Sequence, residues 1–156
     1  MSKVPEYQLV LREGKPELKK RNDLLYSTEI SKPELVADAV EKMFSASSLA
    51  EEYLWMLALN SKNKCIGVFE ISHGTVDISI CSPREILIRA LLAGARSIIL
   101  VHNHPSGDFT PSDDDIAACK RINQACKIVG VTLLDFEIVS NGKFLSFAKE
   151  KIVYEK

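Results

Sequence analysis

Two histidines separated by one residue, His102 and His104, are the part of the sequence best suited to metal chemistry. They follow the short apolar segment 97–101, which is typical of a strand buried on both faces of a sheet. If the chain stays extended beyond this strand, residues two apart project from the same side, so both imidazoles can bind one metal ion. A polar pair in a loop, with no metal, is the alternative interpretation of these two residues.

The next predicted helix offers a third ligand. Ser112 comes eight residues after His104, and Asp115 follows three residues later. A serine followed by acidic residues is adequately explained as a helix cap. From the first helical turn, however, Asp115 can also turn its carboxylate back toward the histidines. Two histidines and one aspartate leave a fourth tetrahedral position for water, which is the arrangement of catalytic zinc sites.

The elements that must position these residues alternate along the chain. Helices are predicted to start at Ser31–Lys32–Pro33–Glu34, at Ser82–Pro83–Arg84–Glu85 and at Ser112. Strands are predicted at 53–60, 64–71, 75–80, 97–101, 131–140 and 143–147. The sequence therefore predicts an α/β fold in three layers, α/β/α, with helices on both sides of a mixed central sheet.

The domain organisation follows from a change in pattern near residue 30. Residues 1–30 are predicted to form an arm with one short strand at 7–11, and residues 31–156 a single domain. Two cysteines seven residues apart, Cys119 and Cys126, are expected to share the buried face of the last helix. The third histidine, His73, is expected in an exposed loop.

Composition excludes several classes of protein. The 156 residues are 46% hydrophobic and 26% charged, and 20 basic against 21 acidic residues give a formal charge of -1. A near-neutral chain has no general attraction to nucleic acid or to an anionic membrane. The four cysteines form no C-x-x-C pair, which argues against a structural zinc ribbon. There is no signal peptide or long apolar run, so a cytoplasmic protein with no membrane partner is expected. The oligomeric state is not predicted.

The segment His102-Asn103-His104-Pro105, with Ser112 and Asp115 downstream, resembles the JAMM motif H-x-H-P-x6-S-x-x-D of the JAB/MPN metalloprotease superfamily. More narrowly it resembles the RadC family, whose pattern also matches Gly74-Thr75, Pro83-Arg84-Glu85-Ile86 and residues 90–102. The likeness covers about residues 31–148. It implies a JAB/MPN (cytidine-deaminase-like) architecture.

The resemblance also implies a site. His102, His104 and Asp115 correspond to zinc ligands, and Ser112 to the residue that supports the bound water or the developing oxyanion. The superfamily uses a further glutamate near the start of the first hairpin strand. Alignment of residues 59–64 puts Glu52 at that position, with Glu51 and Glu70 as rivals.

The implied activity is that of a zinc metallopeptidase that cleaves a peptide or isopeptide bond in a peptide or protein substrate. Zinc lowers the pKa of bound water from ~15.7 toward ~7. Glu52 would take the proton of the attacking water and deliver it to the leaving amine, while Ser112 would donate a hydrogen bond to the oxyanion.

Two alternatives come from other classes. The RadC name is attached to DNA repair, which implies an accessory protein acting on or near nucleic acid, but the near-neutral charge does not favour this partner. The second alternative is a non-catalytic MPN scaffold, although such relatives typically lack the histidines and the aspartate present here. The sequence departs from the family at Phe136, where relatives usually carry the histidine of Leu-Asp-His, and the helix-hairpin-helix segment of longer members is not expected within these 156 residues.

Overall fold

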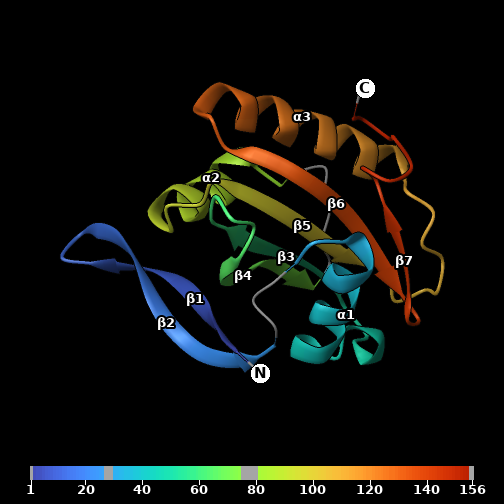
Figure 1. Cartoon of the computed structure of the whole chain (residues 1–156), viewed down its shortest axis with the longest axis horizontal. Coiled ribbons are helices and arrows are strands. Elements are labelled where there is room, and N and C mark those ends of the chain that lie inside the picture. The colour runs from blue at the N-terminus through green and yellow to red at the C-terminus, as the bar shows by residue number, and fades with distance from the viewer. Residues whose placement is uncertain (1, 27–29, 75–80, 155–156) are drawn as a thin grey trace.

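A single mixed sheet forms the centre of the molecule. The computed structural model describes residues 2–26, 30–74 and 81–154. These residues form seven strands in the order β2-β1-β4-β3-β5-β6-β7 (Figure 1). The strands are β1 (Lys3–Arg12), β2 (Lys15–Leu25), β3 (Glu52–Leu59), β4 (Cys65–Gly74), β5 (Ser97–Asn103), β6 (Thr132–Ser140) and β7 (Lys143–Ser146). The pairs β1/β4 and β5/β6 are parallel and the others antiparallel. The predicted α/β class with a mixed sheet is confirmed.

Helices cover both faces of this sheet. Helix α1 (Pro33–Phe44) lies on one face and is followed in the chain by a short 3-10 helix at Ala46–Ser48. Helices α2 (Pro83–Leu92) and α3 (Asp113–Val129) lie on the other face (Figure 1). Successive residues of the central strands pack against the helices on opposite faces of the sheet. Leu54 packs in the core below α2 and α3, whereas Trp55 packs in the core below α1. The predicted three-layer arrangement is confirmed.

Strand β5 lies between β3 and β6, and all seven of its residues are buried. This confirms the prediction that the apolar run forms a central strand that is buried on both faces. The carboxyl end of β5 lies beside the N-terminus of α3, where His102 of the strand is 4.0 Å from Asp115 of the helix.

The helix starts follow the predicted signals with one exception. Ser82 accepts a hydrogen bond from the backbone N–H of Arg84 at the start of α2. At α1 the first helical residue is Pro33, as expected, but the N-cap is Lys32 and no side chain caps this helix. The prediction that Ser31 supplies the capping hydroxyl is wrong, because Ser31 lies one residue before the N-cap position.

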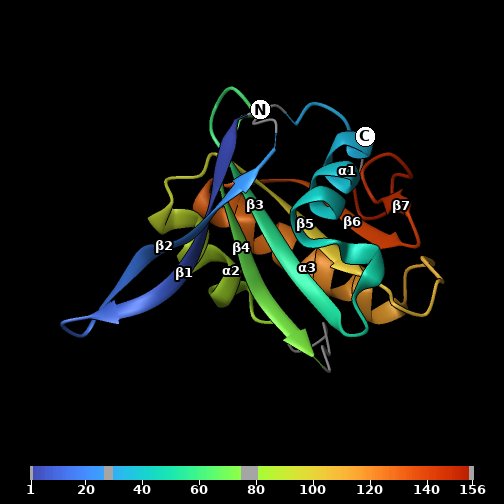
Figure 2. The ribbon, with the colours of Figure 1, turned by 90° about the horizontal axis from the view of Figure 1, so that it is seen from below.

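The N-terminal segment corrects the prediction of one short strand. Glu13 and Gly14, with φ of 52° and 74°, form a two-residue turn that joins two long antiparallel strands, β1 and β2. This hairpin projects from the rest of the molecule (Figure 2). Most side chains of β2 are exposed, and a strand without a buried face leaves no apolar alternation in the sequence.

The predictions for two cysteines, for His73 and for a strand at 75–80 can also be compared with the fold. Cys119 and Cys126 are both buried on α3, as predicted. His73 is exposed, as predicted, but it belongs to strand β4 rather than to a loop, and its ring stacks on Tyr53. The strand predicted at 75–80 lies outside the described residues.

In the part of the chain that the structure describes, each helix is too short or too polar to cross a membrane.

Candidate metal centre

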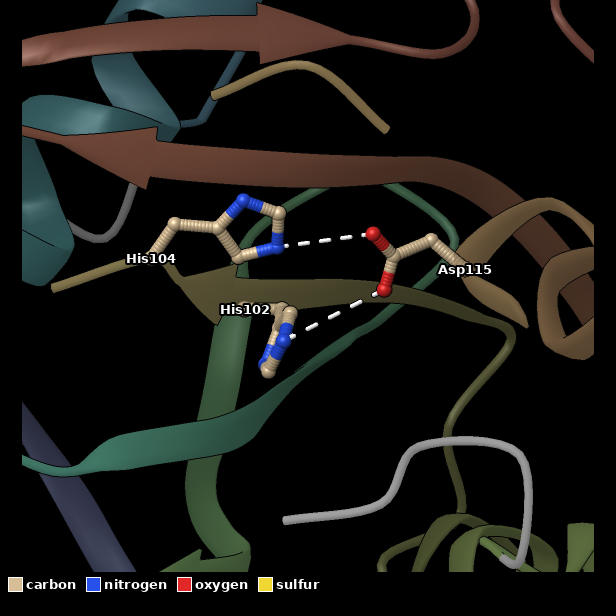
Figure 3. Close-up of side chains that lie close together, drawn as sticks. All are labelled: His102, His104 and Asp115. Carbon is tan, nitrogen blue, oxygen red and sulfur yellow. Dashed lines mark ion pairs between the residues drawn. The ribbon is translucent and has the colours of Figure 1, made fainter. Parts of the chain in front are cut away.

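Three side chains converge where β5 ends and α3 begins. One ligand atom each of His102, His104 and Asp115 lies within 4.8 Å of the others. The Nε2 atom of His104 is 3.4 Å from Oδ2 of Asp115, and Nε2 of His102 is 4.0 Å from Oδ1 of the same carboxylate. Figure 3 shows both rings turned toward the two oxygens of Asp115. The three residues singled out from their spacing therefore share one site.

Backbone carbonyl groups hold both imidazole rings. The Nδ1 atom of His102 is 2.9 Å from the carbonyl oxygen of Tyr53, and Nδ1 of His104 is 2.7 Å from that of Asp108. A carbonyl oxygen only accepts, so each Nδ1 carries the hydrogen and donates it. In the neutral rings Nε2 then holds the free lone pair, and both Nε2 atoms lie on the side of Asp115.

The backbone of His104 continues the alignment of β5 against β6. The N–H of His104 donates to the carbonyl of Val139, and Ser140 donates its hydroxyl to the carbonyl of His104 over 2.5 Å. The chain thus remains extended through both histidines. This is the condition under which residues two apart project from the same side.

Asp115 is fixed by the start of α3. Its backbone N–H donates to the Ser112 hydroxyl oxygen over 3.0 Å, and its Oδ2 accepts from the N–H of Ser112 over 2.9 Å. Only 2% of Asp115 is exposed, whereas Ser112 is exposed. Asp115 therefore fits both interpretations of the sequence, the helix cap and the candidate ligand, because the carboxylate that completes the capping box also lies beside both histidines.

The electrostatics of the three groups differ. Burial lowers the pKa of His102, which favours its neutral form. The hydrogen bond with Asp115 raises the pKa of His104. Burial alone would raise the pKa of Asp115, but the hydrogen bonds from His104 and from the Ser112 backbone outweigh it and lower that pKa. At neutral pH the site therefore offers a carboxylate and a neutral imidazole, and a cation can replace the proton that His104 shares with Asp115.

The structure also locates the three candidate glutamates. Glu52 is the first residue of β3, with Oε2 3.8 Å from Nε2 of His102 and 41% of its side chain exposed. The carboxylate of Glu70 instead pairs with His73, 3.2 Å away. Glu51 precedes β3, its side chain exposed, and its backbone carbonyl accepts from Asn103. Glu52 is thus the glutamate whose carboxylate contacts a predicted ligand.

Sequence reasoning missed the polar groups that support this site. Tyr53 and Asp108 hold the histidine rings through backbone carbonyls, which leave no signal in a sequence. Asn103, buried between the two histidines, carries a signal of its own, because a polar residue at the end of an apolar strand needs hydrogen-bond partners. Phe136, the departure from the family pattern, belongs to the core, where its ring packs on Phe147 at 4.9 Å between centroids.

The donor set fits a divalent cation. Two imidazole nitrogens and one carboxylate oxygen are ligands typical of zinc, and three protein ligands are the number found in catalytic zinc sites. Two of the three side chains are buried, and the hydrogen bonds at each Nδ1 match those that orient histidine ligands. The same ligands also suit other first-row metals, so the geometry indicates a site that could hold a metal ion and does not select which ion.

Comparison with known proteins places the chain in a family. Residues 30–152 match the RadC-like JAB domain. A UPF0758 protein of Coprothermobacter proteolyticus is 37% identical over 154 residues, which are 97% of this chain and 65% of that protein. One from Clostridium acetobutylicum is 38% identical over 127 residues, or 81% of this chain and 55% of that protein.

A third UPF0758 protein, from Caldanaerobacter subterraneus, is 45% identical over 107 residues, or 69% of this chain and 46% of that protein. The chain thus spans about half to two thirds of the length of these curated relatives. Their names state no activity. The resemblance drawn from the motif is confirmed, and the chain belongs to the RadC-like JAB domain family.

Proposed function

We propose that this protein is a zinc-dependent hydrolase that cleaves a peptide or isopeptide bond. The observation that carries this proposal is the convergence of His102, His104 and Asp115, with the Glu52 carboxylate 3.8 Å from Nε2 of His102. Three metal ligands with an adjacent carboxylate are the parts that metal-assisted amide hydrolysis requires. Membership of the RadC-like JAB domain family supports the same reaction class.

The three convergent side chains would hold the metal through both Nε2 atoms and a carboxylate oxygen of Asp115. When bound, Zn²⁺ supplies Lewis acidity, which makes water a better nucleophile at neutral pH and polarises a carbonyl group. The protein's own part is to orient these donors before the ion arrives. The carbonyls of Tyr53 and Asp108 fix the rings, and the capping box fixes the carboxylate.

Glu52 is the candidate for moving protons. Its carboxylate lies beside His102 and is partly open to solvent, so it can reach a water at the site. It would take a proton from the water whose oxygen adds to the amide carbon. It would then return this proton to the nitrogen as the C–N bond breaks, giving a carboxylic acid and an amine.

Ser112 is the candidate for stabilising the negative charge that develops on the carbonyl oxygen. Its Oγ accepts the Asp115 N–H, and the hydroxyl hydrogen remains able to donate. The residue is exposed at the start of α3, next to Asp115. A hydrogen bond aimed at a developing oxyanion commonly contributes about 2.7–4 kcal/mol to catalysis.

The decisive experiment measures zinc-dependent cleavage. The purified protein would be stripped with a chelator, reloaded with Zn²⁺ and incubated with a panel of linear peptides and isopeptide-linked conjugates. We expect cleavage that disappears with the chelator and returns with zinc, and that Glu52→Gln abolishes while keeping the metal. No cleavage across the panel, combined with tight DNA binding at physiological salt, would instead support the nucleic-acid alternative.

A further inference from the structure

Asn103, the residue between the two histidines, binds the backbone on both sides of Glu52. Its Nδ2 donates to the carbonyl oxygen of Glu51 over 3.0 Å, and its Oδ1 accepts from the N–H of Tyr53 over 2.5 Å. Only 2% of Asn103 is exposed. One side-chain amide therefore satisfies a donor and an acceptor that flank the carboxylate closest to His102.

This contact replaces the next step of the β3/β5 ladder. The last backbone pair between these strands is Leu54 with His102. At Asn103 the backbone is paired with Val139 on the other neighbour, β6. A carboxamide offers the same donor and acceptor as a peptide group, so the Asn103 side chain continues the pairing where the backbone of β5 does not.

The other edge of β3 is held differently at this point. Glu52 pairs with Gly74, the last residue of β4. Tyr53 is bound twice from β5, because its carbonyl accepts from the His102 ring while its N–H donates to Asn103. The strand segment that carries Glu52 is thus fixed to the same strand end that carries the histidines.

We propose that Asn103 is a positioning residue, which holds the Glu52 carboxylate at the distance from the metal ligands that proton transfer requires. This inference rests on the proposed hydrolytic function. Proton transfer depends on the placement of the base within about 1 Å, and loss of a supporting hydrogen bond around a metal site typically costs 10- to 100-fold. Asn103 itself has no part in the reaction, since its amide is committed to Glu51 and Tyr53.

The test compares two asparagines that serve opposite ends of the same strand. Asn103→Ala removes the amide next to the site. The matched control is Asn60→Ala, because Oδ1 of Asn60 also binds two backbone groups, the N–H of Lys62 and of Lys64, at the far end of β3. We expect Asn103→Ala to lower kcat about 10- to 100-fold with KM and zinc content within twofold of wild type. Asn60→Ala should leave all three unchanged.

A second readout works without turnover. Amide hydrogen exchange of metal-free protein should be at least about tenfold faster at Tyr53 in Asn103→Ala, with the centre of β3 at Leu57 unaffected. If Asn103→Ala does not fold, Asn103→Ser is expected to show the same pattern, because its short hydroxyl cannot span both backbone groups. Unchanged kcat despite fast exchange at Tyr53, or loss of zinc together with activity, would overturn the positioning role. A wild-type protein that binds zinc and cleaves nothing would overturn the hydrolytic function itself, whatever the exchange result.

Discussion

The Nε2 atom of His104 lies 3.4 Å from Oδ2 of Asp115, the same oxygen that accepts the backbone N–H of Ser112. A helix cap therefore orients the carboxylate before any metal binds. The two histidine rings are likewise oriented by backbone carbonyls. Because the folded chain already holds these ligands in place, little ordering should be needed when the metal binds.

The first prediction concerns this metal site. Wild-type protein is expected to carry about one zinc per chain, and His104→Ala much less, because the substitution removes one of three ligands. Metal analysis after dialysis measures both. His73→Ala is the control, since His73 pairs with Glu70 on β4. Equal zinc content in wild type and His104→Ala would show that His104 is not a metal ligand.

The second prediction separates metal binding from proton transfer. Glu52→Gln should retain zinc while hydrolysis falls by roughly 10²- to 10⁴-fold, the usual contribution of general acid–base catalysis. Glu70→Gln should remain active because the Glu70 carboxylate pairs with His73 instead. Rates with the best substrate of the panel, measured beside zinc content, decide between them. If Glu70→Gln is the inactive variant, the base has been assigned to the wrong strand.

The sequence predicted most of the fold, and the convergence of the three residues that could hold a metal, because their signals are local. The apolar run of β5 and the i, i+2 histidines lie within a few residues of each other, and the Ser112–Asp115 cap is a short pattern. The β1–β2 hairpin escaped prediction because exposed strands need no alternation and its turn uses Glu13-Gly14. The two backbone hydrogen bonds of the Asn103 side chain escaped prediction because their partners, Glu51 and Tyr53, are about fifty residues earlier in the chain.

A third prediction tests the two roles of Ser112. Ser112→Ala removes the cap and should cost about 1 kcal/mol of stability. Ser112→Asp keeps a capping oxygen but, as a carboxylate, has no hydrogen to donate, so its stability should stay close to that of wild type while hydrolysis falls. Urea denaturation and rate measurements on both variants separate the effects. Full activity in Ser112→Asp would show that Ser112 caps the helix and does not stabilise an oxyanion.

The fourth prediction addresses the departure from the family pattern. Phe136 is fully buried in the core under α3 and packs on Phe147. Phe136→Ala should therefore destabilise the protein by about 3–5 kcal/mol. Zinc content should not change, because the side chain belongs to the core rather than to the site. Chemical denaturation and metal analysis check the two expectations, and loss of zinc from a folded variant would mean that Phe136 supports the ligands.

A buried acid on β6 provides the fifth prediction. Glu137 is 0% exposed, and the charge nearest to its buried carboxyl group is the carboxylate of Asp135 on the same strand. Burial first, and then the neighbouring Asp135, raises the pKa of Glu137 to about 10 from an ordinary value of 4.5. The folded protein therefore keeps this group protonated at a pH where the unfolded chain has lost the proton.

The sign of the pH dependence follows. The contribution of Glu137 to stability is fully present below its ordinary pKa of 4.5 and is lost as pH rises toward about 10. Within this window the free energy of unfolding should fall by up to about 1.4 kcal/mol per pH unit. Glu137→Gln stays neutral, so its advantage over wild type should grow by about 2–3 kcal/mol between pH 6 and 8. Urea denaturation at pH 6, 7 and 8 measures this difference, with the exposed Glu17→Gln as control. Parallel pH curves for wild type and Glu137→Gln would show that Glu137 is already ionised in the folded protein.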